Sequence, residues 1–245
     1  MPNKKNGWRF WMLCCFLGSV VAQWGCVSGA PMRGPRIAPK GRVRLNLTPN
    51  ALSVVVPVTT SSSSSTPQQT PSVALPAVDI ALAYGINEIV DIQFHVNTFG
   101  YLTAGTGFQL VRSQFFDLSI SLDVGGVFFG LGGVNFGYLT FPLNVWAGLN
   151  LHKHFGINLS AGYQGYFFFA GVSNLASASV FAHTFVSSLA FDIRVNDFFT
   201  LRPQGSVTVP FVGGGYVNGL LWTAGLGLIF TFGGPPNQAA EAPRG

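Results

Sequence analysis

From residue 51 onward, apolar and polar residues alternate along the chain with a period of two. The segment 89–98 is the clearest example, because its two sets of alternate positions differ in character. One set is apolar and the other polar: Val90, Ile92, Phe94 and Val96 against Asp91, Gln93, His95 and Asn97. Such alternation is typical of a β-strand with one apolar and one polar face, and it does not fit a helix.

Ten runs of this kind follow one another between turn-forming residues. They span 51–59, 78–86, 89–98, 102–112, 115–125, 138–151, 155–169, 182–195, 198–210 and 219–232. Most are longer than the roughly 5 or 6 residues usual in soluble sheets, and they suit a tilted crossing of a bilayer. We therefore predict an all-β fold, a transmembrane antiparallel β-barrel of about ten strands. Eight or twelve strands are the alternatives, because the run at 51–59 is the least regular.

The connections between the runs are of two kinds. Short polar turns at 87–88, 113–114, 152–154 and 196–197 alternate with mostly longer connections at 60–77, 126–137, 170–181 and 211–218. Aromatic residues gather near both ends of the runs, which is typical of the two interfaces of a membrane. In bacterial barrels the short turns face the periplasm, so an even number of strands places both termini there.

Composition excludes two large classes of protein. Only 9% of the 245 residues are charged, mean hydropathy is +0.40, and the chain contains 31 Gly and 23 Phe. Soluble domains usually contain about a quarter charged residues, so an ordinary cytosolic enzyme is not expected. After residue 26 no charge-free apolar run reaches the roughly 20 residues of a spanning helix. A closed barrel is then the remaining way across a bilayer, since lipid offers no partners for unpaired backbone groups.

The N-terminus is typical of an exported protein. Lys4, Lys5 and Arg9 precede an apolar stretch at 10–22, and we predict a signal peptide over 1–25. The three cysteines are Cys14, Cys15 and Cys26. A cleaved chain keeps one of them at most, so no internal disulfide is expected.

Residues 21–26 resemble the lipobox of bacterial lipoproteins, in which small residues precede a cysteine that is acylated and becomes the mature N-terminus. Gly25 fits this pattern, whereas Gln23 stands where the family has an aliphatic residue and Trp24 is bulky for its place. The resemblance implies lipidation of Cys26 and an anchor in outer-membrane lipid. The alternative is ordinary cleavage slightly later, for instance after Gly29, which leaves no anchor.

The segment 26–50 is predicted to be a basic periplasmic tether, followed by the barrel at 51–232. Residues 1–45 hold eight of the 13 basic residues and no acidic ones, which accounts for the positive net charge of the whole chain. The basic character is therefore no indication of nucleic-acid binding, and no nucleic-acid partner is predicted. Binding of anionic lipid head groups by the arginines between 33 and 44 is the alternative to a solvated tether.

Residues 223–232 resemble the closing strand of bacterial outer-membrane barrels. In that family the last strand carries a polar residue, then Gly, then spaced apolar or aromatic residues, and it is read by the barrel assembly machinery. The corresponding positions here are Thr223, Gly225, Leu228, Phe230 and Phe232. The resemblance implies the assembly machinery as a partner. Many such barrels stop at the aromatic residue, whereas this chain continues into residues 233–245, which we predict to be a disordered tail.

The polar face of the strands is predicted to line a narrow lumen that side chains largely fill. Counting back from the turn at 196–197 places Asp192 opposite Arg202, a predicted lumenal ion pair. A structural role is expected for this pair, and ion selectivity in a thin pore is the alternative.

No catalytic residues, metal or cofactor are predicted. His152 and His154 could share a metal ion, but no third ligand accompanies them. His183 and Ser187 both lie on the predicted lipid face, too far apart along one strand for a nucleophile and its base. The sequence thus favours a non-enzymatic outer-membrane barrel, structural or surface-exposed, with Cys26 as its anchor. A narrow pore for small or apolar solutes and a lipid-modifying enzyme are the second and third interpretations.

Overall fold

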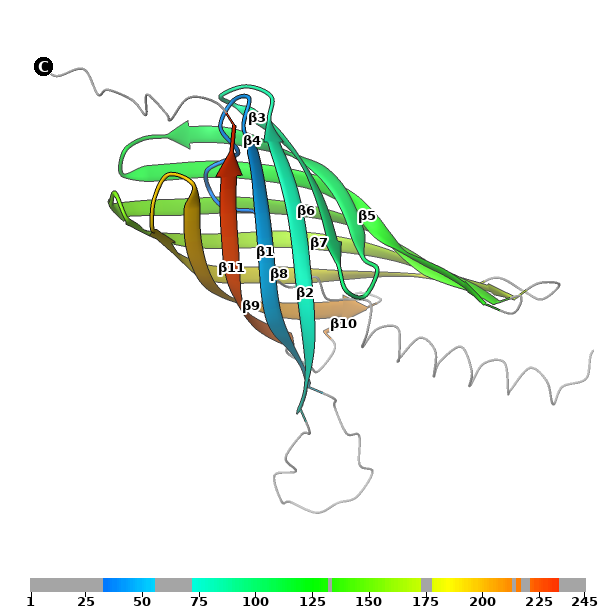
Figure 1. Ribbon diagram of the computed structural model, residues 1–245. Coiled ribbons are helices and arrows are strands. Elements are labelled where there is room, and N and C mark those ends of the chain that lie inside the picture. The colour runs from blue at the N-terminus through cyan, green and yellow to red at the C-terminus, as the bar shows by residue number, and fades with distance from the viewer. Residues whose placement is uncertain are drawn as a thin grey trace, which may run out of the picture.

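The computed structural model describes residues 33–55, 72–131, 134–172, 178–212, 215–216 and 221–233, which form a closed antiparallel β-barrel (Figure 1). Each strand pairs with its neighbour in sequence, and the ring closes through β8 with β9, β9 with β11 and β11 with β1. The ten strands of the ring are β1 (Val43–Val55), β2 (Ser72–Gly85), β3 (Val90–Asn97), β4 (Leu102–Arg112), β5 (Phe116–Leu131), β6 (Val134–His152), β7 (Phe155–Val172), β8 (Ala178–Arg194), β9 (Phe199–Val212) and β11 (Leu221–Phe232). The predicted barrel of ten strands is confirmed.

The short β10 (Gly215–Tyr216) folds back on the end of β9 through the pairs Gly215↔Val212 and Tyr216↔Phe211, and it is not part of the ring. Among the residues described, no helix is long and apolar enough to cross a membrane.

The alternating apolar and polar residues lie on opposite faces of the barrel wall. On β3, Phe94 is 54% exposed on the outer face, while its neighbour Gln93 is 7% exposed on the inner face. The same division holds around the ring: large apolar side chains point outward and buried polar side chains point inward. Outward examples are Leu82, Leu122, Leu143, Leu159, Leu189 and Trp222; inward examples are Asp79, Asp117, Ser121, Asn158, Asp192 and Thr223.

The first strand lies earlier in the chain than predicted. β1 begins at Val43, not at residue 51, and Val43 pairs with both Phe232 of β11 and Tyr84 of β2. The predicted tether over 26–50 is therefore wrong for 43–50. Residues 43–48 alternate like every other strand, with Arg44, Asn46 and Thr48 on the inner face. Because Arg44 occupies one of these inward positions, the segment was predicted to be a charged tether and not a strand.

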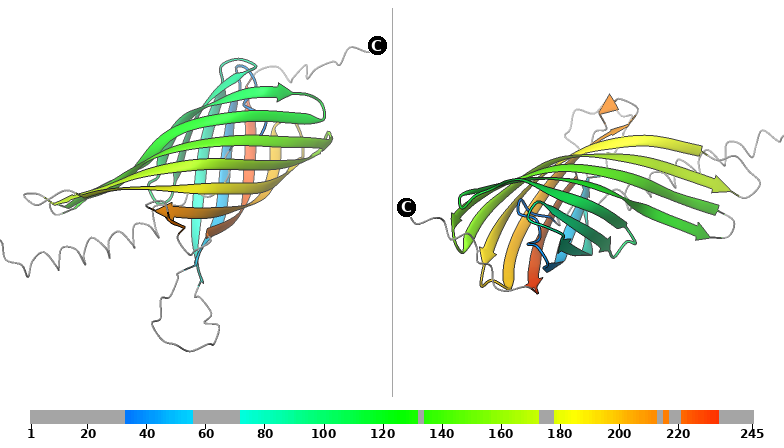
Figure 2. Two further views of the ribbon diagram at one scale, coloured as in Figure 1. Left: turned by 180° about the vertical axis from the view of Figure 1, so that it is seen from behind. Right: turned by 90° about the horizontal axis from the view of Figure 1, so that it is seen from above.

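The two ends of the barrel differ in their connections. At the terminal end, where β1 begins and β11 ends, the short turns 86–89, 113–115, 153–154 and 195–198 join the strands, as predicted. The opposite end, which we term the loop end, contains the other connections. There β5 to β8 extend well past their neighbours (Figure 2), at 16 to 19 residues each.

The long connections predicted at 126–137 and 170–181 are accordingly mostly strand. Gly126 in the first of them is required by the close approach of two strands. A Cβ atom at Gly126 would lie 2.1 Å from the carbonyl oxygen of Tyr138 on β6. Only glycine allows the strands to pair there, so this glycine continues β5 where a loop was expected.

Candidate functional site

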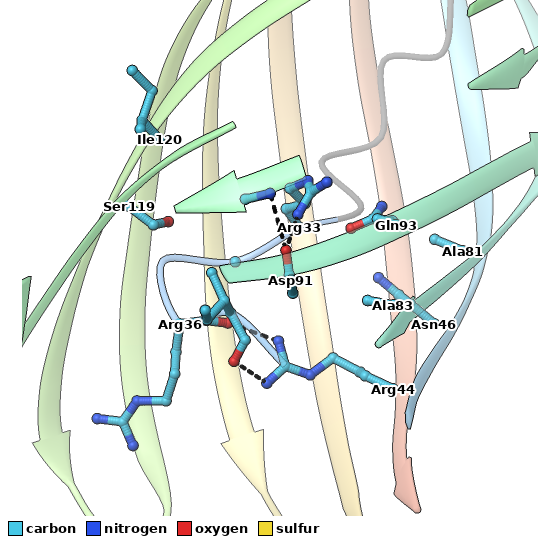
Figure 3. Close-up of a pocket in the computed structure, with 13 residues that line it drawn as sticks. Arg33, Arg36, Arg44, Asn46, Ala81, Ala83, Asp91, Gln93, Ser119 and Ile120 are labelled. Atoms are coloured by element: carbon cyan, nitrogen blue, oxygen red, sulfur yellow. Dashed lines mark hydrogen bonds and ion pairs between the residues drawn. The ribbon is translucent and has the colours of Figure 1, made fainter. Parts of the chain in front are cut away.

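Residues 33–42, which we term the inner plug, lie inside the barrel at its terminal end (Figure 3). Ile37 and Ala38 are 3% and 0% exposed, and Arg33 and Arg42 are also buried. The plug joins β1 through a turn at Gly41, whose φ of 67° is in the left-handed region that glycine tolerates. The N–H of Gly41 donates to the carbonyl of Gly85 on β2 over 2.8 Å. The segment predicted as a tether in the periplasm is, over 33–39, part of the barrel interior, and Lys40 and Gly41 are exposed.

Two arginines of the plug reach carboxylates on the barrel wall. Arg33 bridges two of them: Nη1 lies 2.5 Å from Oδ1 of Asp91, and Nη2 lies 3.2 Å from Oδ1 of Asp123. Arg36 forks onto Asp117, with Nε 3.1 Å from Oδ2 and Nη2 3.1 Å from Oδ1. Charge-assisted contacts of this forked kind are stronger and more directional than neutral hydrogen bonds. They tie the plug to β3 and β5.

The plug backbone is held as closely as its side chains. Arg44 of β1 donates to the carbonyl oxygens of Arg36 and Ile37 over 2.7 and 3.2 Å. Gln109 of β4 donates to the carbonyl of Pro35 over 3.0 Å and accepts the N–H of Ile37 over 3.0 Å. These bonds satisfy backbone groups that have no strand partner, which is the condition for burying an irregular segment.

Asp91 fixes both ends of the plug's central turn. Its Oδ1 accepts from Arg33, as described above, and its Oδ2 accepts the N–H of Ala38 over 2.9 Å. On the wall side, the N–H of Gly107 donates to the same carboxylate over 3.1 Å. One aspartate therefore joins the start and the end of the segment 33–38 to the wall.

The space left around the plug is small. The cavity bounded by Arg33, Arg36, Arg44, Asn46, Asp91 and Gln93 measures about 10 Å³ (Figure 3), which is about the room that one water molecule needs. The described wall residues therefore pack closely around the plug at this level.

The ion pair between Asp192 and Arg202 is formed across the hairpin of β8 and β9. Nε of Arg202 lies 2.6 Å from Oδ1 of Asp192, and Nη2 lies 3.1 Å from Oδ2. The third nitrogen, Nη1, donates to the carbonyl of Arg33 over 2.9 Å. The guanidinium thus joins the wall to the plug, a contact that sequence reasoning missed.

Deeper in the lumen, a second polar cluster surrounds Asp79 of β2. His95 Nε2 lies 2.8 Å from Oδ1 of Asp79, and Asn50 of β1 donates to Oδ2 of the same carboxylate. The His95 ring also contacts Tyr101 edge-on, with ring centroids 5.6 Å apart. All of these side chains are inward-facing residues of the first three strands and the turn between β3 and β4.

Toward the loop end, aromatic side chains form a buried cluster in the lumen. Tyr101, Tyr138 and Tyr166 form a buried cluster with Val127, and Phe168 packs against it. Tyr138 is 1% exposed, and its ring stacks on Tyr101 at 6.2 Å. The cluster belongs to β5, β6, β7 and the turn before β4, so it grows from one side of the barrel.

The facing wall of β8, β9 and β11 carries smaller inward groups. Ser206 and Thr223 hydrogen-bond to each other over 2.6 Å, and Ser188 bonds to Ser160. Among the described residues, neither amide atom of the buried Gln204 has a hydrogen-bond partner, and the same holds for the buried hydroxyl of Thr184. Buried polar atoms of this kind normally bind ordered water, so this wall is a place for water in the lumen.

The closing-strand residues all lie on β11 at the β1 seam. Thr223 faces inward, whereas Leu228, Phe230 and Phe232 belong to the outward set. Gly225 pairs with Asn50 of β1, and a Cβ atom there would lie 2.8 Å from the Asn50 Cβ. Recognition of these residues by the assembly machinery stays a prediction.

The histidines outside the lumen have simple surroundings. His152 and His154 lie at the turn between β6 and β7 with ring centroids 5.5 Å apart, and the described residues contain no group of three or more potential metal ligands. His183 stacks between Phe211 at 5.5 Å and Tyr163 at 6.0 Å on the outer wall. Cys26, the predicted signal peptide at 1–25 and residues 234–245 of the predicted tail lie outside the described residues.

Comparisons with protein families and with curated protein sequences find no match. Similar solved structures include Ail of Yersinia pestis, with 9% identity, a TM-score of 0.43, and coverage of 79% of this chain and 99% of that one. Neisserial surface protein A has 8% identity and a TM-score of 0.39 over 78% and 96% of the two chains. The translocator domain of NalP from Neisseria meningitidis has 9% identity and a TM-score of 0.44 over 78% and 88%.

Proposed function

We propose that this chain is a non-enzymatic bacterial outer-membrane β-barrel whose lumen is sealed by its own residues. The observation that carries the proposal is an inverted distribution of polarity: charge lies inside a closed barrel, and large apolar side chains cover its outside. In water this arrangement would be unstable, whereas in a bilayer it satisfies both surfaces.

The seal is supported at two levels. At the terminal end the inner plug contacts the wall and leaves about 10 Å³. Toward the loop end the cluster around Tyr138 is buried in the lumen on the side of β5 to β7. A barrel filled in this way suits a structural or surface-exposed role better than transport.

The proposal includes an orientation. The terminal end, with its short turns, faces the periplasm, and the extended strands β5 to β8 face outward, as in bacterial barrels generally. The closing strand β11 is the contact for the assembly machinery, and outer-membrane lipid surrounds the apolar wall.

A lipid anchor at Cys26, after removal of the signal peptide, completes the proposal. Seven peptide units separate Cys26 from Arg33, and an extended chain of that length reaches at most about 25 Å. An acylated Cys26 would therefore have to insert into the membrane close to the barrel itself.

A narrow pore for small or apolar solutes is the second candidate. The buried and unbonded amide of Gln204 and the hydroxyl of Thr184 favour it, because they indicate water in the lumen. The sealed barrel remains the better supported function, since the plug lies across the path from the terminal end.

A planar-bilayer measurement separates the two functions. Folded protein, identified by a gel mobility that changes on heating, is added to the bilayer at physiological salt. We expect no current above the leak of the bare bilayer. Steady channel currents from the unmodified chain would refute the seal and favour the pore.

A further inference from the structure

We propose that Asp91, Asp117 and Asp123 form a binding site for guanidinium groups at the terminal end, and that the inner plug occupies this site as an exchangeable ligand. An arginine-bearing peptide segment supplied from outside would displace the plug and open a cation-preferring path. The inference rests on the proposed seal and goes beyond it, because it names what the seal binds and what removes it.

The three carboxylates obtain their cationic partners from the plug. Asp91 and Asp123 share Arg33, and Asp117 holds Arg36. The bonds from the wall to these carboxylates come from neutral donors, namely the N–H of Gly107 to Asp91 and the Asn150 amide to Asp117. The wall's own arginines are engaged elsewhere: Arg202 with Asp192, Arg194 with Asn150, and Arg44 with plug carbonyls. The three aspartates of the wall thus form a site that the inner plug fills.

The geometry suits guanidinium better than ammonium. Arg36 uses two nitrogens on the two oxygens of Asp117, and Arg33 divides two nitrogens between Asp91 and Asp123. A planar fork matches such spacing, whereas a lysine ammonium is a point charge that makes one strong contact at a time. The ligand class is therefore an arginine side chain.

The plug contacts several strands around the wall. Its bonding partners come from β1 (Arg44), β3 (Asp91), β4 (Gln109), β5 (Asp117) and β9 (Arg202). On β6, Gly148 leaves room for Pro35, because a Cβ atom there would lie 2.3 Å from the proline Cγ. Displacement of this segment would free the cross-section of the lumen at the terminal end.

Beyond the plug, inward polar side chains continue along one wall. The aromatic cluster grows from β5 to β7, while Gln204 and Thr184 on the facing wall are buried polar groups that call for water. The plug lies between this polar wall and the terminal end.

Charge predicts the ion preference of the opened lumen. The described wall side chains that face the lumen include five aspartates and three arginines: Asp79, Asp91, Asp117, Asp123 and Asp192, with Arg44, Arg194 and Arg202. The plug adds Arg33, Arg36 and Arg42. Removal of the plug changes the net formal charge of these lumenal side chains from positive to negative. A negative lumen favours cations in a narrow pore.

Exchange can begin at Arg36, whose side chain is 39% exposed while Asp117 is buried beneath it. The plug is covalently tethered, so its effective concentration at the site is of the order of millimolar or higher. A competing peptide must therefore carry several arginines or be present at comparable concentration.

The first test uses the full chain with Arg33→Ala and Arg36→Ala together, in planar bilayers under a KCl gradient. We expect the unmodified chain to be closed and the folded variant to conduct, with a reversal potential displaced toward that of the cation. Oligoarginine on the terminal side should block this current at a concentration at least about tenfold lower than oligolysine. The matched control is Arg112→Ala, which removes the exposed pair with Glu88 and should stay closed.

A second measurement does not depend on folding of the arginine variant. Ile37→Cys is introduced into the refolded full chain, with Cys14, Cys15 and Cys26 changed to Ser, and labelled with a membrane-impermeant maleimide. Ile37 is buried, so labelling should be slow, and oligoarginine should accelerate it by at least about tenfold, whereas oligolysine should not.

The outcomes separate the two proposals. Currents through the unmodified chain would overturn the seal. If the unmodified chain is closed, the seal stands, and four results would each overturn the guanidinium site. They are a folded arginine variant that stays closed, a current that prefers anions, equal effects of the two peptides, and labelling that oligoarginine leaves unchanged.

Discussion

Arg33 and Asp91 are 58 positions apart in the sequence, yet Nη1 of the arginine lies 2.5 Å from Oδ1 of the aspartate inside the barrel. Asp91 also accepts the N–H of Ala38, so one carboxylate holds two points of the inner plug. Both residues of the pair are nearly inaccessible to solvent. The relationship makes Asp91 the most informative single position for testing how the plug is held.

We expect Asp91→Asn to lower the free energy of unfolding by about 1.5–3 kcal/mol, because a buried charge-assisted contact is lost while Arg33 keeps Asp123 as a partner. Urea unfolding of the refolded protein in detergent, followed by circular dichroism, measures the change. The control is Glu88→Gln, which alters an exposed pair with Arg112 and should change stability by about 0–1 kcal/mol. Equal effects of the two variants would contradict the assignment of Asp91 as the main plug contact.

Asp192 and Arg202 should show strong energetic coupling. Either single change, Asp192→Asn or Arg202→Gln, leaves a buried charge without its partner, whereas the double variant removes both charges. A double-mutant cycle of unfolding free energies should give a coupling of about 1–3 kcal/mol. Additive effects of the two single changes would mean that the two side chains have no coupling free energy.

The outer face can be tested at one position with two substitutions. Leu122 is 58% exposed on the wall. We expect Leu122→Arg to cost about 2–4 kcal/mol, as a charge does at mid-membrane on the lipid face of such barrels. Leu122→Ala should cost much less, since little packing is lost at an exposed site. Folding yields into lipid vesicles give the comparison, and similar yields would argue against contact with lipid.

Gly126→Ala should interfere with the pairing of β5 and β6. The added Cβ atom would lie 2.1 Å from the Tyr138 carbonyl, so the strands would have to separate, at a cost of about 1–3 kcal/mol. Gly171→Ala on β7 is the matched control, because nothing lies within 4 Å of a Cβ atom there. The temperature at which the folded gel band disappears should fall for the first variant only.

Metabolic labelling with a fatty acid tests the proposed anchor. The unmodified chain should incorporate label, and Cys26→Ser should incorporate none, because the only acceptor proposed for acylation is gone. An unlabelled unmodified chain would remove the anchor from the proposal without touching the barrel.

Local pattern was sufficient to predict most of the wall and one of its ion pairs. The strands around Gln93 and Ser121 alternate without exception, and the residues Asp192 and Arg202 flank a short turn, so counting from that turn placed them opposite each other. Contacts at a separation of 10 residues within one hairpin follow from register alone.

The partners of Arg33 and Arg36 could not be found in this way. They lie 58 to 90 positions away, on strands whose depth in the barrel depends on the stagger of the whole ring. One signal was present: the strands carry inward aspartates with few basic residues to balance them, while residues 33–44 are basic without acidic neighbours. That complementarity indicates a lumenal location, because buried charges need partners.

The turn at Gly41 connects the plug directly to β1, which forms the seam of the barrel with β11. Arg42 runs directly into Val43, which pairs with Phe232 of the last strand, and no spacer lies between them. Separation of β1 from β11 would therefore pull on the segment inside, and withdrawal of that segment would strain the first pair of the seam. The resistance of this barrel to mechanical opening along β1 and β11 is accordingly set in part by the arginines bound within it.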